Sequence, residues 1–268
     1  MKIVNRLYSI EGRWSLHLTV DGQRYMNLFA ININWLLGIS LIVLFIGCAE
    51  NKTTISTEET ANPEVMATPI RYLALGDSYT IGESVPAENN YPNLIVSALQ
   101  AAEMKAEDAQ IIAKTGWTTD ELNVAIQEAA PDTTFHIVSL LIGVNNQFRG
   151  RNVEEYAPEF EDLLQQAIRF ANGDRSKVFV VSIPDYAYTP FGQQSKPELI
   201  SKGIDEYNAV NRSITERYQI AYFDITPISR EGIEDPTLVA TDKLHPSGAQ
   251  YERWVELILE DIKKIIAL

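Results

Sequence analysis

From residue 70 onward, short apolar runs alternate with longer stretches of helical periodicity, and this alternation constrains the fold more than any other feature. Five of the runs are rich in β-branched residues and mostly apolar on both faces, which is typical of strands buried between two helix layers. These candidate strands are 70–75, 109–113, 135–142, 177–183 and 220–223. The pattern predicts a parallel sheet whose strands are joined by right-handed helical crossovers.

Helical periodicity is clearest in three stretches, where apolar residues recur every three to four positions. These stretches are 153–168, 199–214 and 251–265. Two capping boxes, in which Ser or Thr precedes Glu or Gln by three residues, mark helix starts at Thr118 with Glu121 and at Ser247 with Gln250. We therefore expect an α/β three-layer sandwich, with a parallel five-stranded sheet and helices on both faces. In such a sheet, ligands bind at the carboxyl ends of the strands.

The segment 30–47 carries no charge, and its densest part, 35–47, has the length of a signal-peptide core, roughly 7–15 residues. A membrane span needs roughly 20 apolar residues, so this segment is marginal as one. The basic residues that precede it are Lys2, Arg6, Arg13 and Arg24. Its end, Gly47-Cys48, resembles a bacterial lipoprotein signal, although Phe45 stands where leucine is usual.

The lipoprotein resemblance implies export, attachment of a diacylglyceryl group to Cys48, and location at the cell envelope. An uncleaved membrane anchor and a buried core helix are the alternatives, and Met26 is an alternative start of translation. Residues 49–69 are rich in Thr, Glu, Asn and Pro without an apolar period, which predicts a flexible tether. We thus expect a signal segment at 1–48, a tether at 49–69 and one α/β domain at 70–268.

The formal charge of −14, from 22 basic and 36 acidic residues, argues against a phosphate-backbone partner, so we expect no nucleic-acid binding. The sequence has no basic cluster that would bind anionic lipid headgroups. Cys48 is the only cysteine, which excludes an intrachain disulfide and a metal site built from several thiolates. Membrane contact is therefore expected through a lipid on Cys48.

Ser78 lies in Leu75-Gly76-Asp77-Ser78, directly after the first predicted strand, on a tight turn that Gly76 would permit. This position is at the carboxyl end of a strand, where a parallel sheet binds ligands. The tripeptide Gly-Asp-Ser is common by chance, and a helix N-cap or turn serine is the alternative interpretation. It is not the nucleophile elbow of the α/β-hydrolases, because Thr80 stands where the second glycine of that motif should be.

A serine hydroxyl needs a base to become a nucleophile, and the chain has three histidines. His17 precedes the apolar segment, and His136 lies near the start of a predicted strand, where a structural role is expected. His245 lies in the loop before the last predicted helix, where Pro246 disfavours helical geometry. In such a loop, the carboxylate of Asp242 can reach back to the imidazole Nδ1 and fix its tautomer. The alternative interpretation of Asp242 and His245 is a solvated loop.

Gly116 follows the second predicted strand and Asn145 follows the third, so both lie at the same expected edge of the sheet. The backbone N–H of a glycine and the amide of an asparagine are suitable donors to the oxyanion of an acyl-transfer reaction. Ordinary turn chemistry is the better interpretation of either residue when it is taken singly. A long loop at 183–192 carries aromatic residues that either line a substrate pocket or pack the loop itself.

Taken in this order, the segments around Ser78, Gly116, Asn145 and His245 resemble the SGNH hydrolase family, also called GDSL esterases and lipases. The resemblance covers roughly the whole predicted α/β domain, and its first and last motifs are specific. Asn146 replaces the aspartate of the family's G-x-N-D motif, which leaves the catalytic groups intact.

The resemblance implies the flavodoxin-like SGNH fold and a serine ester hydrolase, with Ser78 as nucleophile, His245 as base and Asp242 as the acid that orients it. The backbone N–H groups of Ser78 and Gly116 and the side chain of Asn145 would hold the oxyanion, and no metal or organic cofactor is required. The implied substrates are carboxylic esters, and among these a lysophospholipid or a short acyl ester is the leading expectation. A carbohydrate O-acetyl esterase and a non-catalytic binding lipoprotein on the same fold are the alternatives.

Overall fold

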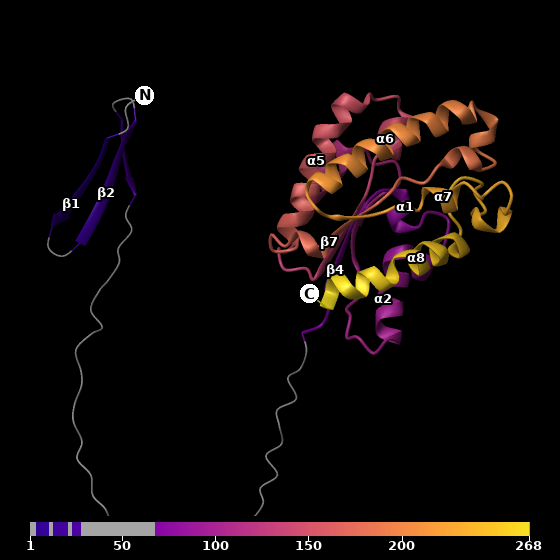
Figure 1. Cartoon of the computed structure of the whole chain (residues 1–268), viewed down its shortest axis with the longest axis horizontal. Coiled ribbons are helices and arrows are strands. Elements are labelled where there is room, and N and C mark those ends of the chain that lie inside the picture. The colour runs from indigo at the N-terminus through magenta and orange to yellow at the C-terminus, as the bar shows by residue number, and fades with distance from the viewer. Residues whose placement is uncertain (1–3, 11–12, 21–22, 28–67, 268) are drawn as a thin grey trace, which may run out of the picture. The chain divides into compact units, whose positions relative to one another are not determined.

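The computed structural model describes residues 4–10, 13–20, 23–27 and 68–267 (Figure 1). The chain divides into two compact units, Met1–Asn62 and Pro63–Leu268. The segment 30–47, Cys48 and the tether up to residue 67 lie outside the described residues, so the signal, the lipid attachment and the tether stay predictions. Within the part of the chain that the structure describes, no helix is both long and apolar enough to span a membrane.

The described part of the first unit is a three-stranded antiparallel sheet with β2 in the centre. Its strands are β1 Val4–Ile10, β2 Arg13–Val20 and β3 Gln23–Asn27. These strands were not predicted, although Leu16, Leu18 and Val20 alternate with polar residues at the two-residue period of a strand.

The second unit is built on a parallel sheet of five strands in the order β5-β4-β6-β7-β8. The strands are β4 Tyr72–Gly76, β5 Gln110–Ala113, β6 Ile137–Leu141, β7 Val178–Val181 and β8 Ala221–Phe223. All five predicted strands are confirmed, with ends displaced by at most two residues, and so is the α/β class with a parallel sheet.

Burial differs between the centre and the edges of this parallel sheet. Every residue of β4, β6 and β7 is buried, whereas the edge strands β5 and β8 are partly exposed. Strands covered on both faces must be apolar on both faces, which explains their near-continuous apolar runs in the sequence. The register places Gly76 opposite both Ala113 and Leu141, so the carboxyl ends of β4, β5 and β6 meet at one edge.

Helices cover both faces of the sheet (Figure 1). The α-helices are α1 Ser78–Ile81, α2 Tyr91–Ala101, α3 Thr119–Ala129, α4 Val144–Phe148, α5 Val153–Phe170, α6 Pro197–Arg217, α7 Thr226–Ser229 and α8 Gly248–Ala267. The 3-10 helices are η1 Ala87–Asn89, η2 Arg175–Lys177, η3 Tyr186–Tyr188, η4 Gly192–Gln194 and η5 Pro236–Leu238. Helix α2 packs against α8 on one face, and α5 packs against α3 and α6 on the other. The three predicted apolar stripes lie on α5, α6 and α8.

The two predicted capping boxes have different outcomes. At the start of α3, the Glu121 carboxylate accepts the Thr118 backbone N–H at 2.9 Å, and the box is complete. Before α8, the Ser247 hydroxyl accepts the Gln250 N–H at 3.3 Å, but the Gln250 side chain donates to the Leu238 carbonyl instead of accepting from Ser247. The second box is only half formed, because the Ser247 N–H already donates to the same Leu238 carbonyl at 2.9 Å.

Candidate active site

Ser78 is the first residue of α1 and is separated from the end of β4 by Asp77 alone. The Asp77 carboxylate caps α1 by accepting the Tyr79 N–H at 3.0 Å. Gly76 was predicted to permit a tight turn, but the structure requires a glycine there for space, because an added Cβ would lie 2.1 Å from Thr80 Oγ1 and 2.4 Å from the Leu141 carbonyl oxygen. Gly76 thus lets the end of β4 pack closely against both α1 and β6, and Ser78, two residues further on, is 4% exposed.

His245 and Asp242 meet in the loop before α8. Asp242 Oδ2 lies 2.5 Å from His245 Nδ1, and Asp242 Oδ1 accepts the backbone N–H groups of Leu244 and His245 at 2.9 and 3.0 Å. Burial by itself raises the pKa of Asp242, but hydrogen bonds from the imidazole, from these two N–H groups and from the Ser84 hydroxyl outweigh it and bring the pKa to about 2. The ionised carboxylate holds the Nδ1 proton and leaves Nε2 as the nitrogen that can accept one.

Gly116 lies in the loop between β5 and α3, with a left-handed backbone at φ +88°. A Cβ there would meet only Arg149 Nη2, at 3.9 Å, so conformation rather than space favours glycine at this position. The guanidinium of Arg149 donates to the Gly116 carbonyl at 2.7 Å, and this hydrogen bond fixes the orientation of the peptide group between Gly116 and Trp117.

The adjacent asparagines Asn145 and Asn146 lie on α4, and their side chains contact different groups. Asn145 Nδ2 donates to the Trp117 carbonyl at 2.9 Å, which places its amide beside the Gly116 loop. Asn146 is fully buried, accepts the Thr119 N–H at 3.1 Å and donates to the Thr119 hydroxyl at 2.7 Å. Asn146 thus anchors the start of α3, while Asn145 faces the pocket.

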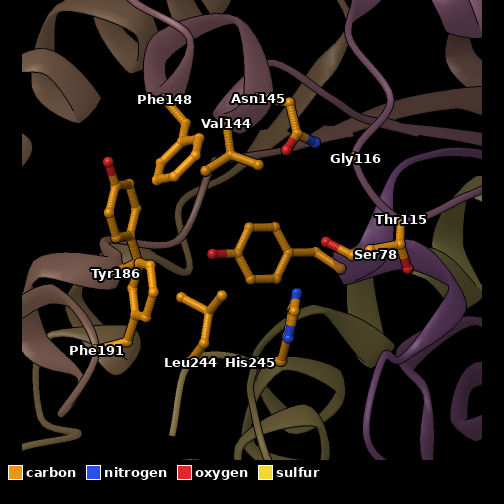
Figure 2. Close-up of a pocket in the computed structure, with 11 residues that line it drawn as sticks. Ser78, Thr115, Gly116, Val144, Asn145, Phe148, Tyr186, Phe191, Leu244 and His245 are labelled. Atoms are coloured by element: carbon orange, nitrogen blue, oxygen red, sulfur yellow. The ribbon is translucent and has the colours of Figure 1, made fainter. Parts of the chain in front are cut away.

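One pocket of about 130 Å³ is lined by four of the predicted site residues: Ser78, Gly116, Asn145 and His245. Figure 2 shows these residues at one end of the pocket, with the His245 ring directed toward Ser78. The opposite end is apolar and is lined by Val144, Phe148, Tyr186, Phe191 and Leu244. Asp242 does not line the pocket, and it contacts the Nδ1 atom of the His245 ring. The remaining predicted site residue, Cys48, lies outside the described residues.

The other two histidines lie away from this pocket or outside its unit. His136 immediately precedes β6, at the amino end of the sheet, and its Nδ1 accepts the Arg71 backbone N–H at 3.1 Å. Burial, followed by the charges of Lys177 and Arg71, lowers the pKa of His136, which keeps the ring neutral. His17 lies in β2, in the first unit.

Several residues around the pocket carried no recognisable sequence signal. Ser84 donates from its hydroxyl to Asp242 Oδ2 at 2.7 Å across 158 residues of sequence. The Tyr79 ring packs edge-on against the His245 ring, with centroids 5.6 Å apart. The predicted aromatic loop 183–192 contributes Tyr186 and Phe191 to the pocket, whereas its third aromatic, Tyr188, does not line it.

The model of the GDSL-like lipase/acylhydrolase family matches residues 74–253. The structure resembles TesA at 16% identity, with a TM-score of 0.56 over 73% of this chain and 99% of that one. It also resembles the lipase/acylhydrolase from Enterococcus faecalis, at 21% identity with a TM-score of 0.55 over 73% and 96% of the two chains. Phospholipase A1 from Streptomyces albidoflavus NA297 matches at 19% identity, with a TM-score of 0.56 over 74% and 99%. No curated protein sequence matches the chain.

Proposed function

The chain belongs to the GDSL-like lipase/acylhydrolase family and is an ester hydrolase. We propose that it acts through an acyl-enzyme on Ser78, with His245 as the base and Asp242 as the acid that orients the imidazole. The observation that carries this proposal is the pairing of His245 Nδ1 with Asp242 Oδ2 at 2.5 Å, in a pocket that His245 shares with the buried Ser78. An orienting carboxylate, an imidazole and a serine hydroxyl in one site are the groups that nucleophilic acyl transfer requires.

In the proposed reaction, Ser78 Oγ attacks the ester carbonyl carbon while His245 Nε2 takes the hydroxyl proton. The tetrahedral oxyanion accepts hydrogen bonds from the backbone N–H groups of Ser78 and Gly116 and from the Asn145 amide. Collapse of this intermediate breaks the ester C–O bond, and His245 returns its proton to the leaving alcohol. Water then attacks the acyl-enzyme with His245 again as base, which releases the carboxylic acid and restores the Ser78 hydroxyl.

The pocket supports a short acyl group as the preferred acid part of the substrate. Its volume of about 130 Å³ lies below the roughly 300–1,000 Å³ of sites that enclose a drug-sized ligand. Its far end is lined by the rings of Tyr186, which is buried, and of Phe191 and Phe148, which are 39% and 60% exposed. An acetyl or butyryl group fits such a space, and a long chain would have to extend past Phe148 into solvent.

Hydrolysis of p-nitrophenyl esters of increasing chain length tests this proposal. We expect kcat/KM to be highest for the acetate or butyrate and to fall toward the laurate, and we expect Ser78→Ala and His245→Ala to lose roughly 10³-fold or more in kcat. His136→Gln is the matched control and should retain activity. Undiminished hydrolysis by Ser78→Ala would refute the mechanism. A preference for lysophosphatidylcholine or for acetylated xylan over the short soluble esters would refute the substrate assignment alone.

A further inference from the structure

Ser84 is an exposed residue in the turn after α1, outside every motif discussed above. We propose that Ser84 is a positioning residue, whose hydroxyl holds the Asp242 carboxylate in the orientation that pairs with His245. This inference rests on the proposed Ser78, His245 and Asp242 triad and adds a fourth residue that acts through Asp242.

The hydrogen bonds around Asp242 assign Ser84 a distinct place. Asp242 Oδ1 is held by two backbone N–H groups of its own loop. Asp242 Oδ2 has two side-chain partners, His245 Nδ1 at 2.5 Å and the Ser84 hydroxyl at 2.7 Å. Among the described residues, Ser84 is therefore the one hydrogen-bond donor to this carboxylate that lies outside the Asp242 loop. It fixes Oδ2, the oxygen that faces the imidazole.

Ser84 also belongs to the turn that carries the nucleophile. Gly82 ends α1, and the N–H groups of Gly82 and Glu83 both donate to the Ser78 carbonyl, at 3.1 and 3.0 Å. The Glu83 carboxylate accepts the hydroxyl of Thr115, the neighbour of Gly116. Consecutive side chains of this turn thus contact the Asp242 loop on one side and the Gly116 loop on the other. The Ser84 contact links the position of the acid to that of the nucleophile.

The backbone of Ser84 is left-handed, with φ +67°, and Lys243, the neighbour of Asp242, has φ +68°. This region is unfavourable for residues with a Cβ, and glycine would adopt the same turn without strain. Four other residues with a Cβ also have positive φ and lie away from the pocket, so the backbone by itself does not indicate a function. The test therefore has to separate the effect of the hydroxyl from that of the backbone.

The two hydrogen bonds on Oδ2 predict what the loss of the Ser84 hydroxyl would do. The carboxylate would keep His245 Nδ1 as a partner of Oδ2 but would lose the contact that ties it to the α1 turn. It would then rotate more freely and orient the imidazole less well.

The test compares Ser84→Ala with Ser84→Gly in the full-length chain, because both remove the hydroxyl and only glycine relieves the backbone. We expect both variants to lower kcat for p-nitrophenyl acetate roughly 3- to 30-fold, the range for loss of a hydrogen bond to a charged group acting partly on the transition state. We expect KM to stay within about twofold of the wild-type value in both, because Ser84 does not line the pocket. Ser84→Gly should melt no lower than Ser84→Ala.

Two controls separate this inference from the proposed function. Asp242→Asn and His245→Ala are assayed beside the Ser84 variants. If these controls are inactive while both Ser84 variants keep the wild-type kcat, or lose activity only through a higher KM, the role of Ser84 is refuted and the triad stands. If the controls retain wild-type activity, the triad itself is refuted. A rate loss in Ser84→Ala that Ser84→Gly restores would assign the effect to the backbone and overturn the role of the hydroxyl.

Discussion

At the scale of single residues, the paired asparagines separate a proposed chemical role from a structural one. Asn145 lines the pocket beside Gly116, and Asn146 is buried against Thr119 at the start of α3. Both lie on one short helix, where neighbouring side chains point about 100° apart, so only one can face the substrate. The family resemblance selected Asn145, and the structure places Asn145 in the pocket.

Substitution of each asparagine should therefore have a different effect. We expect Asn145→Ala to lower kcat and kcat/KM together by about 10²–10³-fold, because it removes a donor used in the transition state. Asn146→Ala should instead lower the free energy of unfolding by about 1–3 kcal/mol with a modest change in rate, because Thr119 loses buried partners. Steady-state kinetics and urea unfolding of both variants measure the two effects.

Asn146→Asp is the matched control for this pair. Its carboxylate would still accept the Thr119 N–H and would lie at the positive end of the α3 dipole, so we expect it to be tolerated. A larger loss of kcat in Asn146→Ala than in Asn145→Ala would contradict the assignment.

Asp77 predicts a pH dependence of stability. Burial raises its pKa from an ordinary value near 3.8 to about 7, against the opposing effect of the hydrogen bond from Tyr79 N–H. The folded chain thus keeps a proton that the unfolded chain releases, so this contribution to stability is present below about pH 4 and is lost as pH rises through about 7. Between pH 5 and 8 we expect the free energy of unfolding of the wild type to fall by about 2–4 kcal/mol relative to Asp77→Asn. Parallel curves for the two proteins, measured by urea unfolding, would rule this out.

At the scale of elements, the sequence predicted those strands and helices whose apolar residues are buried. Strands β4, β6 and β7 are covered on both faces, so their apolar runs identified them, and the stripes of α5, α6 and α8 identified those helices. Short elements such as α1 and α4 were missed, because four or five residues do not show a helical period. The capping box predicted at Ser247 is only half formed, because the Leu238 carbonyl that competes for the Gln250 side chain is a tertiary contact that the local sequence does not show.

The junction of β4 with β6 yields a prediction at this scale. A Cβ at Gly76 would lie 2.1 Å from Thr80 Oγ1 and 2.4 Å from the Leu141 carbonyl oxygen, so Gly76→Ala must displace α1 and the end of β6 from the end of β4. We expect it to lower the free energy of unfolding by about 1–3 kcal/mol. It should also lower kcat, because Ser78 lies two residues further on and a small displacement of a nucleophile is costly. Gly248→Ala is the control, since its Cβ would meet its nearest neighbour at an ordinary 3.4 Å. Equal melting temperatures for the two variants would contradict the argument.

At the scale of the whole molecule, the pocket is assembled from segments that are far apart in the sequence. Ser78, Gly116, Asn145 and His245 meet because parallel strands deliver their following loops to one edge, which the order of the motifs allowed us to anticipate. Ser84 could not be anticipated, because its partner lies 158 residues away and no local pattern marks a serine as the donor to a distant carboxylate. The shape of the apolar end likewise depends on loop conformations that no periodicity predicts.

The place of the chain in the cell stays a prediction, and we propose that it is anchored through a lipid on Cys48. The support is the uncharged segment 30–47 that ends at Gly47-Cys48. Diacylglyceryl attachment would supply two acyl chains, which suffice for stable anchoring at about 0.8 kcal/mol per buried CH₂. We expect Cys48→Ala to abolish incorporation of labelled palmitate in a bacterial host. A mature protein whose N-terminus, read by mass spectrometry, lies upstream of Cys48 would exclude this processing.

The most direct test of the central claim is covalent labelling of the nucleophile. A fluorophosphonate reacts with a serine only where a base and an oxyanion site activate it. We predict that peptide mass spectrometry will find a single phosphonyl group on the peptide that contains Ser78, and that Ser78→Ala and His245→Ala will not be labelled. A label on any other residue, or full labelling of Ser78→Ala, would contradict the account.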